Sequence, residues 1–504
     1  MVKRKIENGP DTPSTGWDDM ARRWKPLDVL LGGTLSMRDH ADEYLPRHDK
    51  ESYPKWERRR DRSVLLPKYD EALDTICAKP FSRPMSYEGE LPPELLLTWN
   101  DMDQQGNDAT TFTKAWFREG WHRGLVHILV DSPTVDIPNL KAQQDSGVRP
   151  YATIISARNL FAWRTKVIKG IGERLTHIRF YECALEPDGY GDREVKRIRE
   201  FNSPTGMDTC SWKTFEEVNG EWVVKETGEF EHPAGIPLAT FYVDRRGPML
   251  ARPPLEQIGH LNIRHFQSDS EQQDLLQFAR VGVWFARGWT EKELANGLTV
   301  GANRFVGTTN PDGSLEVVEH TGAAIEAGAK DIDRLEARMD GLVQEQLASQ
   351  PGDVKATAHA LAAGKQQSRV GQSIMVANAV SRRVFDLVAG FYNGVKVPEK
   401  FRPRIFSDFV VSMLGGTDVP SILEMRVNRD LSRRTTFEEL QRRSFLSDRV
   451  DADEEERRLA EEATEDIRLG IGQPPQPPDR PFGDGVIDNP DAPPAGSKKG
   501  KKAA

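Results

Sequence analysis

The sequence predicts an α+β protein, and three observations support this fold class. Apolar residues recur at helical spacing before residue 131 and again after Pro254. Between about 149 and 246 the pattern changes to short β-runs joined by turn residues. A long helical pattern over 358–393 then precedes a helical C-terminal region. Strands and helices are therefore segregated along the chain, which is typical of α+β architectures.

Composition and charge limit the class of protein. The chain has 504 residues, which suggests about three domains at roughly 150 residues each. Its formal charge is −9, from 78 acidic and 69 basic residues, whereas a protein that coats nucleic acid normally carries a basic excess. Its three cysteines form no CxxC pair, which argues against a disulfide framework or a cysteine-based zinc site.

The sequence shows no targeting or membrane segment. The N-terminus lacks the apolar core of a secretion signal, and no apolar run approaches the ~20 residues that span a bilayer. We therefore expect a protein made in a cytoplasm, with no membrane partner.

Helices dominate the first part of the chain, after a polar stretch 1–16 that is expected to be flexible. From Trp17 to Leu31 the apolar spacing is helical, but Pro26 interrupts it, so two short helices are predicted. A charged helical pattern from Tyr53 to Ile76 contains Pro67, which is expected to break it.

Residues 108–130 are predicted to begin as a helix and to end as a strand, Leu125–Val130. The β-runs that follow include a good hairpin signal, Asn219-Gly220, because this dipeptide favours the positive φ angles of a type I′ turn. The runs themselves are Ala152–Ile155, His177–Tyr181, Thr214–Val218, Trp222–Lys225 and Thr240–Val243.

Pro254 opens a helical segment that is expected to reach 286. Its middle, 267–274, is polar on every side, so it is expected to bridge solvent or to pack against something outside this chain. A second amphipathic helix is predicted over 327–349, with Leu335 and Met339 on its apolar face.

The stretch between these two helices, 287–326, is rich in Gly and Thr and predicts a small β insert. Its strands are expected at Arg304–Gly307 and Leu315–Glu319, joined by a turn. The turn residues are Asn310, Pro311, Asp312 and Gly313.

After the second helix a loop, 350–357, leads into a helical rod over 358–393 that would be ~54 Å long. The remaining elements expected are a strand at Phe406–Leu414, a helical region 416–470 and a disordered, proline-rich tail 471–504. The helical region is predicted to contain helices at 419–429 and 436–444, the second with a Thr436-x-x-Glu439 capping box, and a solvated acidic helix at 451–466.

Signatures of enzymes are weak in this sequence, so we expect no catalytic, cofactor-binding or metal-ligating residues. No Walker A loop, HExxH, GxSxG or GxGxxG occurs. The Asp101-x-Asp103 stretch starts like a calcium loop, but Phe112 stands where the loop needs a carboxylate, so a turn is predicted. The histidine pairs His122/His127 and His260/His265 are five residues apart, which favours packed or surface side chains over ligands.

The cationic run Arg58–Arg62 is interspersed with acids. We expect it to form a solvated or intersubunit ion-pair face rather than a nucleic-acid site.

Several short motifs carry a resemblance to a known family. The segment from Pro254 to Gly288 contains Leu261-Asn262, His265 and Ser268 at the spacing of an L-N-x-x-H-x-x-S helix, and Gly124 with Ile128–Pro133 matches a G-x-x-x-LLVD-x-P strand. From about Met20 to Glu456, the order of segments resembles the portal proteins of tailed bacteriophages. It is most similar to a portal-like family long catalogued only as a domain of unknown function.

The resemblance implies a ring of about twelve identical subunits at one vertex of a viral capsid, made in the bacterial cytoplasm and carried in the virion. Double-stranded DNA would be packaged through its centre by terminase and later ejected. The implied parts are a mixed α/β wing (17–253), a stem helix (254–286), a β clip (287–326), a second stem helix (327–349), a tunnel loop (350–357), a long wing helix and strand (358–415) and a crown-like C-terminal region (416–470).

The implied partners are other copies of the chain, the large terminase subunit, head-completion or adaptor proteins, capsid and scaffold proteins, and DNA without sequence specificity. Partners would dock on the clip turn at Asn310–Gly313. The tunnel loop would face DNA through Gln350, Asp353 and Lys355.

Two other classes of protein are also consistent with the sequence. Another phage minor head or connector protein would lack the order of helix, insert, helix, loop and rod. A nuclease would need clustered carboxylates for metal ions, and the sequence offers no convincing cluster.

Overall fold

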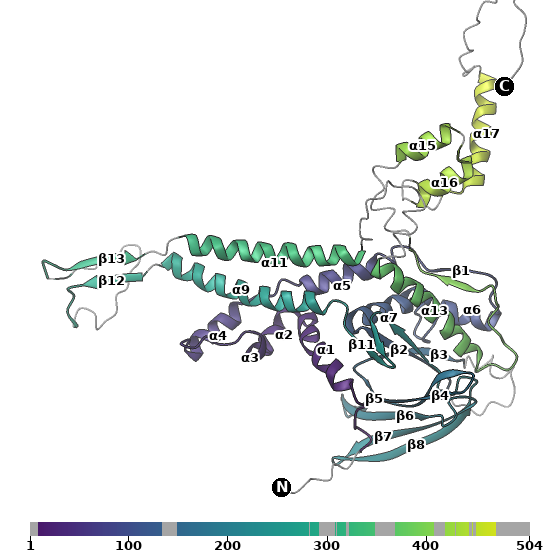
Figure 1. The fold of residues 1–504 in the computed structure, drawn as a ribbon, viewed down its shortest axis with the longest axis horizontal. Coiled ribbons are helices and arrows are strands. Elements are labelled where there is room, and N and C mark those ends of the chain that lie inside the picture. Colours follow the sequence, from purple (N-terminus) through teal and green to yellow (C-terminus); the bar gives the residue numbers. More distant parts are fainter. Residues whose placement is uncertain are drawn as a thin grey trace, which may run out of the picture. The chain divides into compact units, whose positions relative to one another are not determined.

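The structure is a computed structural model that describes residues 9–133, 149–281, 283–291, 308, 310–318, 322–347, 368–407, 419–428, 430–442, 446 and 450–469. The chain divides into two compact units, Met1–Met413 and Leu414–Ala504 (Figure 1). The expected wing, stem and long-helix segments therefore belong to one unit, and the helical C-terminal region forms the other.

The first unit combines helices with two larger sheets, as expected for an α+β protein. Its helices are α1 (Trp17–Leu31), α2 (Gly33–Asp39), α3 (Ala41–Tyr44), α4 (Tyr53–Arg62), α5 (Lys68–Ala78), α6 (Pro93–Asn100), α7 (Ala109–Arg123), α9 (Glu256–Val281), α11 (Ala323–Leu347) and α13 (Arg369–Ala389). The larger sheets have the strand orders β3-β2-β9 and β4-β5-β6-β7-β8.

Strand β2 (Leu125–Asp131) lies at the centre of the three-stranded sheet, between β3 (Tyr151–Ser156) and β9 (Leu238–Tyr242). Its predicted apolar run is confirmed, and both of its faces are covered. Val126, Ile128 and Val130 pack into the main core with the aromatic residues of α7, whereas Leu129 packs with residues of the five-stranded sheet. Side chains alternate along a strand, so one strand joins the helical layer to the second sheet.

A glycine sets the junction between α7 and β2. Gly124 ends the helix with φ +90°, and a Cβ there would lie 2.4 Å from the carbonyl oxygen of Arg252. Its own carbonyl accepts a 2.8 Å hydrogen bond from the backbone N–H of Val243, beside β9. Only glycine combines this conformation with such a close approach.

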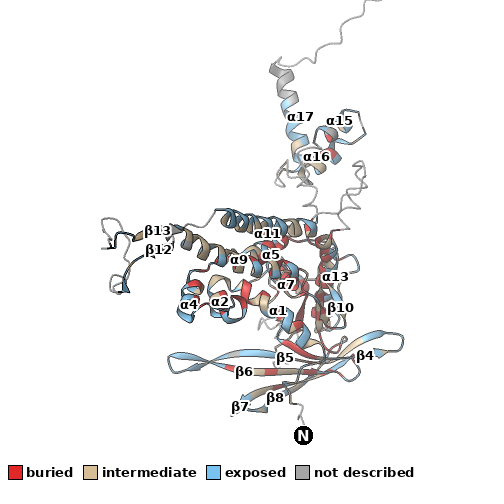
Figure 2. Cartoon of the chain, turned by 60° about the vertical axis from the view of Figure 1, so that its left-hand side comes forward, coloured by how far each residue is buried: buried red, intermediate tan, exposed pale blue. Residues whose placement is uncertain are grey.

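The five-stranded sheet is an antiparallel meander that lies below the helices in Figure 2. Its strands are β4 (Leu160–Ile168), β5 (Gly172–Asp188), β6 (Gly191–Asn202), β7 (Thr209–Val218) and β8 (Glu221–Glu231). The hairpin predicted at Asn219-Gly220 is confirmed, because these residues join β7 to β8 with φ values of 54° and 84°. The other predicted β-runs lie within β3, β5, β7 and β8, and Thr240–Tyr242 of the fifth lies within β9.

Part of the N-terminal stretch expected to be flexible is docked on this sheet. The backbone N–H of Ser14 donates to the carbonyl of Phe161 at 2.9 Å, and its hydroxyl donates to the carbonyl of Trp163 at 3.0 Å. Residues 9–16 therefore lie against the edge strand β4.

The expectation of two helices around Pro26 was wrong, because α1 is continuous. A proline inside a helix loses one backbone hydrogen bond and crowds the carbonyl four residues earlier, at a cost of about 3 kcal/mol that packing can offset. Trp24, Leu27 and Leu30 are buried before and after it, so tertiary packing holds the helix on both sides. Helix α1 also crosses α9 closely, since a Cβ at Gly259 would lie 2.2 Å from Leu27 Cδ2.

The break predicted in the charged helix is confirmed, with Ser63–Pro67 separating α4 from α5. The arginine run of α4 is less solvated than expected, since Arg59 is only 2% exposed. Its guanidinium donates two hydrogen bonds to the buried Glu51 carboxylate, at 3.0 and 2.8 Å, and a third to the carbonyl of Pro46 at 3.0 Å.

Two expectations for 358–415 are corrected. The predicted continuous rod over 358–393 was wrong at Ser368, which has extended backbone angles and caps α13 by accepting a 3.0 Å hydrogen bond from Gly371 N–H. Helix α13 has 21 residues, about 31 Å. The strand described in this region is β14 (Arg402–Arg404), paired with β1 (Ser86–Glu88), and Phe406 and Ser407, where the predicted strand Phe406–Leu414 begins, are not in a strand.

The end of β14 has a physical cause, because Ile405 N–H donates to Asn378 Oδ1 of α13 at 3.0 Å and so leaves the strand ladder. The short strands β10 (Arg245–Gly247) and β11 (Leu250–Ala251) form a further pair. Residues 408–414 of the predicted strand and residues 358–367 of the predicted rod lie outside the described part of the chain.

The second unit contains α15 (Val419–Val427), α16 (Arg433–Arg442) and α17 (Ala452–Leu469). The predicted solvated acidic helix is confirmed over the exposed part of α17. The predicted capping box was wrong, since Thr436 lies inside α16 and Ser432 Oγ accepts the 3.1 Å hydrogen bond from Thr435 N–H at its start. The predicted tail, 471–504, lies outside the described residues.

Among the described helices, none combines the length and apolar character that a membrane crossing requires.

The buried Arg59–Glu51 pair generates a stability prediction. Replacing Arg59 by Met leaves a buried carboxylate without its cation, which should cost about 3–5 kcal/mol of unfolding free energy. The double variant Arg59→Met/Glu51→Met should recover most of that loss. Arg22→Ala, which removes the exposed pair with Asp19, should cost less than about 1 kcal/mol. Chemical denaturation followed by tryptophan fluorescence measures all three, and equal losses for the two single variants would refute the prediction.

The Arg59–Glu51 pair should also make the unfolding free energy depend on pH. Hydrogen bonds from Arg59 lower the pKa of the Glu51 carboxyl below its ordinary value. Because the folded pKa is the lower one, the contribution is complete above the unfolded-state pKa and is lost as pH falls through the folded pKa. The stability difference between wild type and Arg59→Met should therefore shrink on acidification. A difference that stays constant down to acid pH would contradict this assignment.

Candidate docking and assembly site

Two long antiparallel helices that carry a β-hairpin at their far end are the most distinctive feature of the first unit (Figure 1). Helices α9 and α11 have 26 and 25 residues, so they extend about 39 and about 38 Å. The hairpin consists of β12 (Val283–Arg287) and β13 (Ser314–Val318), which are antiparallel neighbours. The helix pair thus holds a short ribbon well away from the main core.

The near end of the pair is anchored by apolar packing. Leu255, just before α9, belongs to the main core together with Ile258 and Phe266 of α9 and Met339 and Leu347 of α11. The apolar face predicted for the second helix is confirmed, because Leu335 and Met339 are both buried.

The polar middle of α9 is paired within the chain, contrary to the expectation that it bridges solvent or meets an outside partner. Ser63 Oγ donates to Ser270 Oγ at 2.7 Å, and Gln267 Nε2 donates to the carbonyl of Tyr44 at 2.9 Å. The Asp274 carboxylate pairs with Arg62 at 2.8 Å, so part of the α4 arginine run is bound to this helix. Polar side chains thereby fix the orientation of α9 where apolar contacts are few.

The two helices also meet through polar contacts. His265 Nε2 lies 3.0 Å from Glu336 Oε1, and Gln272 Nε2 donates to the carbonyl of Ile325 at 2.8 Å. Gln272 fits because α11 has a glycine opposite it, as a Cβ at Gly328 would lie 2.1 Å from Gln272 Oε1.

The hairpin starts earlier than the sequence indicates. Its first strand occupies Val283–Arg287, so the prediction of helix as far as 286 was wrong. The sequence does contain a signal for a strand here, since Val283-Trp284-Phe285 is a β-branched and aromatic run. Strand β13 overlaps the predicted Leu315–Glu319 and pairs with β12, whereas the predicted Arg304–Gly307 lies outside the described residues.

The predicted turn is confirmed at Asn310, Pro311, Asp312 and Gly313. Gly313 N–H donates to the carbonyl of Asn310 at 3.0 Å, and Asp312 N–H donates to Asn310 Oδ1 at 3.1 Å. The Asn310 amide also donates to the carbonyl of Gly288 at 2.7 Å, which ties the turn to the end of β12. Asn310, Pro311 and Asp312 are exposed, and so is the Phe285 ring on β12, at 54%. The tip therefore offers both polar and apolar groups to a partner.

The outer face of α11 is exposed and carries charges of both signs. Lys330 pairs with Glu326 at 2.7 Å, within the helix. In the described part of the chain, no ion pair is formed by Arg334 or Arg338, which follow Lys330 at successive four-residue steps. The exposed charged residues of this face are Glu326, Lys330, Asp333, Arg334, Arg338, Asp340 and Glu345.

The other residues singled out in the sequence have structural contacts. His122 lies between Tyr69 and Asp28, with both contacts at 2.9 Å, and burial lowers the pKa of His127 to about 3. The predicted turn at Asp101 is confirmed, since the Asp101 carboxylate accepts hydrogen bonds from Gly106 N–H and the Arg149 guanidinium.

No group of three or more potential metal-binding side chains occurs among the residues that the structure describes. The predicted tunnel-loop residues Gln350, Asp353 and Lys355 lie outside those residues.

Sequence reasoning missed a second polar site, on the five-stranded sheet. His177, Arg179 and Lys213 are visible in the sequence as ionisable positions on predicted strands or beside them, whereas Arg164 lies between two predicted strands. Their convergence depends on strand register, which a single sequence does not reveal.

Comparisons with known proteins bear on the helix pair. A family model described as a domain of unknown function (DUF4055) matches residues 254–392, which include α9, the hairpin, α11 and α13. The match agrees with the resemblance to such a domain over this part of the chain. No curated protein matches the sequence.

The chain also resembles chains in solved structures, with low TM-scores. The chain is similar to one in the virion of a native gene transfer agent particle, with 11% identity, a TM-score of 0.34 and coverage of 81% of this chain and 91% of that one. It is also similar to a chain in the neck of an empty gene transfer agent particle, with 11% identity, a TM-score of 0.33 and the same coverage. Scores of this size do not establish a common overall fold.

The contact at Gly328 yields a prediction with a control in the same helix. Gly328→Ala should gain helix propensity but displace the Gln272 amide and break its hydrogen bond to Ile325. Gly341→Ala meets no atom within 4 Å and should stabilise by about 0.5–1 kcal/mol. We expect Gly328→Ala to be about 1 kcal/mol less favourable than Gly341→Ala in chemical denaturation. Equal stabilisation by the two variants would contradict a tight contact between the helices.

Proposed function

We propose that this chain is the subunit of a phage portal, a ring of about twelve copies at one capsid vertex through which double-stranded DNA is packaged and later ejected. The observation that carries the proposal is the β-hairpin held at the end of α9 and α11. In the portal resemblance, two stem helices flank a clip in the same order along the chain. The match to residues 254–392 covers this part and supports the assignment.

In this proposal the exposed hairpin tip is the docking surface for the large terminase subunit and, after packaging, for head-completion or adaptor proteins. Phe285 supplies apolar area and the turn at Asn310–Gly313 supplies polar groups. Capsid and scaffold proteins would contact the ring elsewhere. The protein would be a virion component without catalytic activity of its own, since its role is to shape a channel.

The outer face of α11 is proposed to meet neighbouring copies. Heterologous ring contacts join two different surfaces of the same chain, so a face with both signs of charge can pair with complementary charges on the next copy. Arg334 and Arg338 are the strongest candidates, since their charges are exposed. The excess of acids over bases in the chain also suits a channel that must release DNA, because cations that neutralise phosphates would retain it.

Ring formation is the first test. Mass photometry of the purified protein should show particles at about twelve times the 56.8 kDa of one chain. Arg334→Glu/Arg338→Glu should reduce the ring fraction without changing the circular dichroism of the subunit. Lys330→Glu is the comparison, because Lys330 is paired within its own helix and should matter less. A wild-type protein that stays monomeric at micromolar concentration would rule out the ring.

Docking at the hairpin is the second test. Phe285→Ala and Asn310→Ala should leave ring assembly intact and weaken binding of the cognate large terminase subunit, measured by biolayer interferometry. Val167→Ala removes an even more exposed apolar side chain from the five-stranded sheet and should bind terminase like wild type. Unchanged binding by both hairpin variants would place the docking surface elsewhere, whereas loss of rings would assign the hairpin to the subunit interface.

A further inference from the structure

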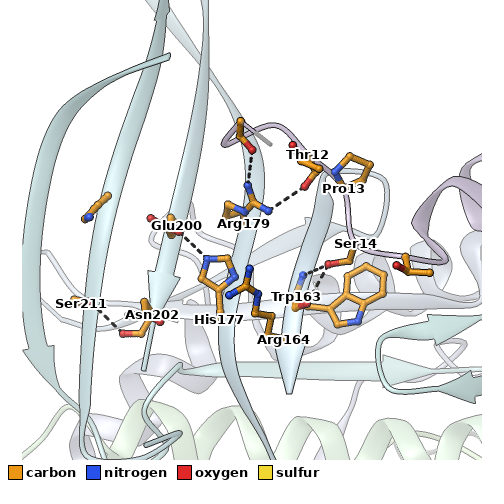
Figure 3. Close-up of a pocket in the computed structure, with 13 residues that line it drawn as sticks. Thr12, Pro13, Ser14, Trp163, Arg164, His177, Arg179, Glu200, Asn202 and Ser211 are labelled. Carbon is orange, nitrogen blue, oxygen red and sulfur yellow. Dashed lines mark hydrogen bonds and ion pairs between the residues drawn. The ribbon is translucent and has the colours of Figure 1, made fainter. Parts of the chain in front are cut away.

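A polar hollow of about 790 Å³ lies on the five-stranded sheet, apart from the helix pair (Figure 3). Strand register brings its side chains together. Arg164 on β4 is opposite His177 on β5, and Arg179 on β5 is opposite Glu200 on β6, which is opposite Lys213 on β7. Residues two apart on a strand share a face, so these five residues form two adjacent rows on one face of the sheet.

The N-terminal segment covers one side of the hollow. The Arg179 guanidinium donates to the carbonyls of Gly9 and Thr12, at 3.1 and 2.9 Å, and also to that of Pro10. Ser14 is bound to Trp163 by hydrogen bonds in both directions. These contacts turn an open sheet face into a partly enclosed site with a fixed wall.

Positive charge is in excess inside the hollow. Its lining residues include the cations Arg164, Arg179 and Lys213 but only one carboxylate, Glu200. That carboxylate is already engaged, since His177 Nε2 lies 2.7 Å from Glu200 Oε1. This hydrogen bond lowers the pKa of Glu200 and so keeps it ionised. Within the described residues, neither Arg164 nor Lys213 forms an ion pair, although the whole chain has a net charge of −9.

Two buried nitrogen atoms in the lining lack a protein partner among the described residues. They are Nδ1 of His177, whose side chain is 13% exposed, and Nε of Arg179. An arginine Nε always carries a hydrogen, so it is a donor that requires an acceptor. Buried polar atoms are normally satisfied, and an unsatisfied one commonly marks a missing ligand or water.

We propose that this hollow binds an oxyanion, either a phosphate or a carboxylate group. Arg164 and Lys213 would supply charge-assisted hydrogen bonds, and the free donor on Arg179 would contact the same group. The hollow is larger than one such group requires, so the group can be a free ion or part of a larger molecule. The two sources that the proposal considers are inorganic phosphate and a glutamate side chain of an acidic protein segment. The proposal does not depend on a portal function.

Isothermal titration calorimetry of the full chain at low ionic strength tests the proposal, with inorganic phosphate and a hexaglutamate peptide as separate probes. We expect saturable binding of at least one probe, and Arg164→Ala/Lys213→Ala should weaken it at least about tenfold. Both side chains are exposed, so the variant should fold normally, which circular dichroism checks. Lys169→Ala is the matched control, since it removes an exposed cation from the β4–β5 turn outside the hollow and should bind like wild type.

The pattern of binding across the two probes identifies the source of the bound oxyanion. Binding of phosphate alone assigns a free anion, and preferential binding of the peptide assigns a protein carboxylate; both support the site. Absence of saturable binding by either probe overturns it, as does binding that the double variant and Lys169→Ala weaken equally. Binding of a short DNA duplex with neither probe bound would also overturn it, in favour of a nucleic-acid surface.

Discussion

The arrangement of the first unit depends on the burial of β2 on both faces. A strand with only one apolar face could be covered by helices alone, but Leu125–Asp131 presents apolar side chains in both directions. The aromatic residues of α7 cover one face of β2, and the five-stranded sheet covers the other. The meander is therefore required for the core, although most of its length extends beyond it. This layering also fixes the position of Gly124, where the chain passes from helix to strand against the backbone of Arg252.

The helix pair meets a different requirement, because it must hold a hairpin at the far end of a helix about 39 Å long without a core of its own. Apolar packing secures the end near Leu255 and Met339, and polar contacts to α3, α4 and α11 take over further out. Hydrogen bonds and ion pairs have directional geometry, so they specify the rotation of α9 about its axis more sharply than a small apolar contact does. A rigid arm of this kind positions its tip accurately while leaving it open to a partner.

Sequence patterns predicted the elements whose signals are local. The type I′ turn at Asn219-Gly220, the apolar run of β2, the Asn310–Gly313 turn and the apolar face of α11 all follow from residues that are close in sequence. The predictions were wrong where contacts between residues far apart in sequence determine the secondary structure. Pro26 is tolerated because buried neighbours hold α1, and the apolar stretch before Ala286 suits helix or strand until β13 supplies its partner.

The two candidate sites also differ in whether their residues are close together in sequence. The hairpin turn could be located from its own residues, whereas the polar rows on the sheet require the registers of β4 to β7, which no single strand encodes.

The two edges of the five-stranded sheet are protected by different means, and this has a consequence for aggregation. An exposed strand edge offers unpaired N–H and C=O groups to other chains. Strand β8 places acidic side chains along its edge, among them Glu226 and Glu229, so approaching strands of the same kind repel one another. Strand β4 instead has Ser14 bonded to its backbone at Phe161 and Trp163. The N-terminal segment therefore covers part of this edge, and a chain cleaved beyond Ser14 would present a fresh edge for strand pairing between molecules.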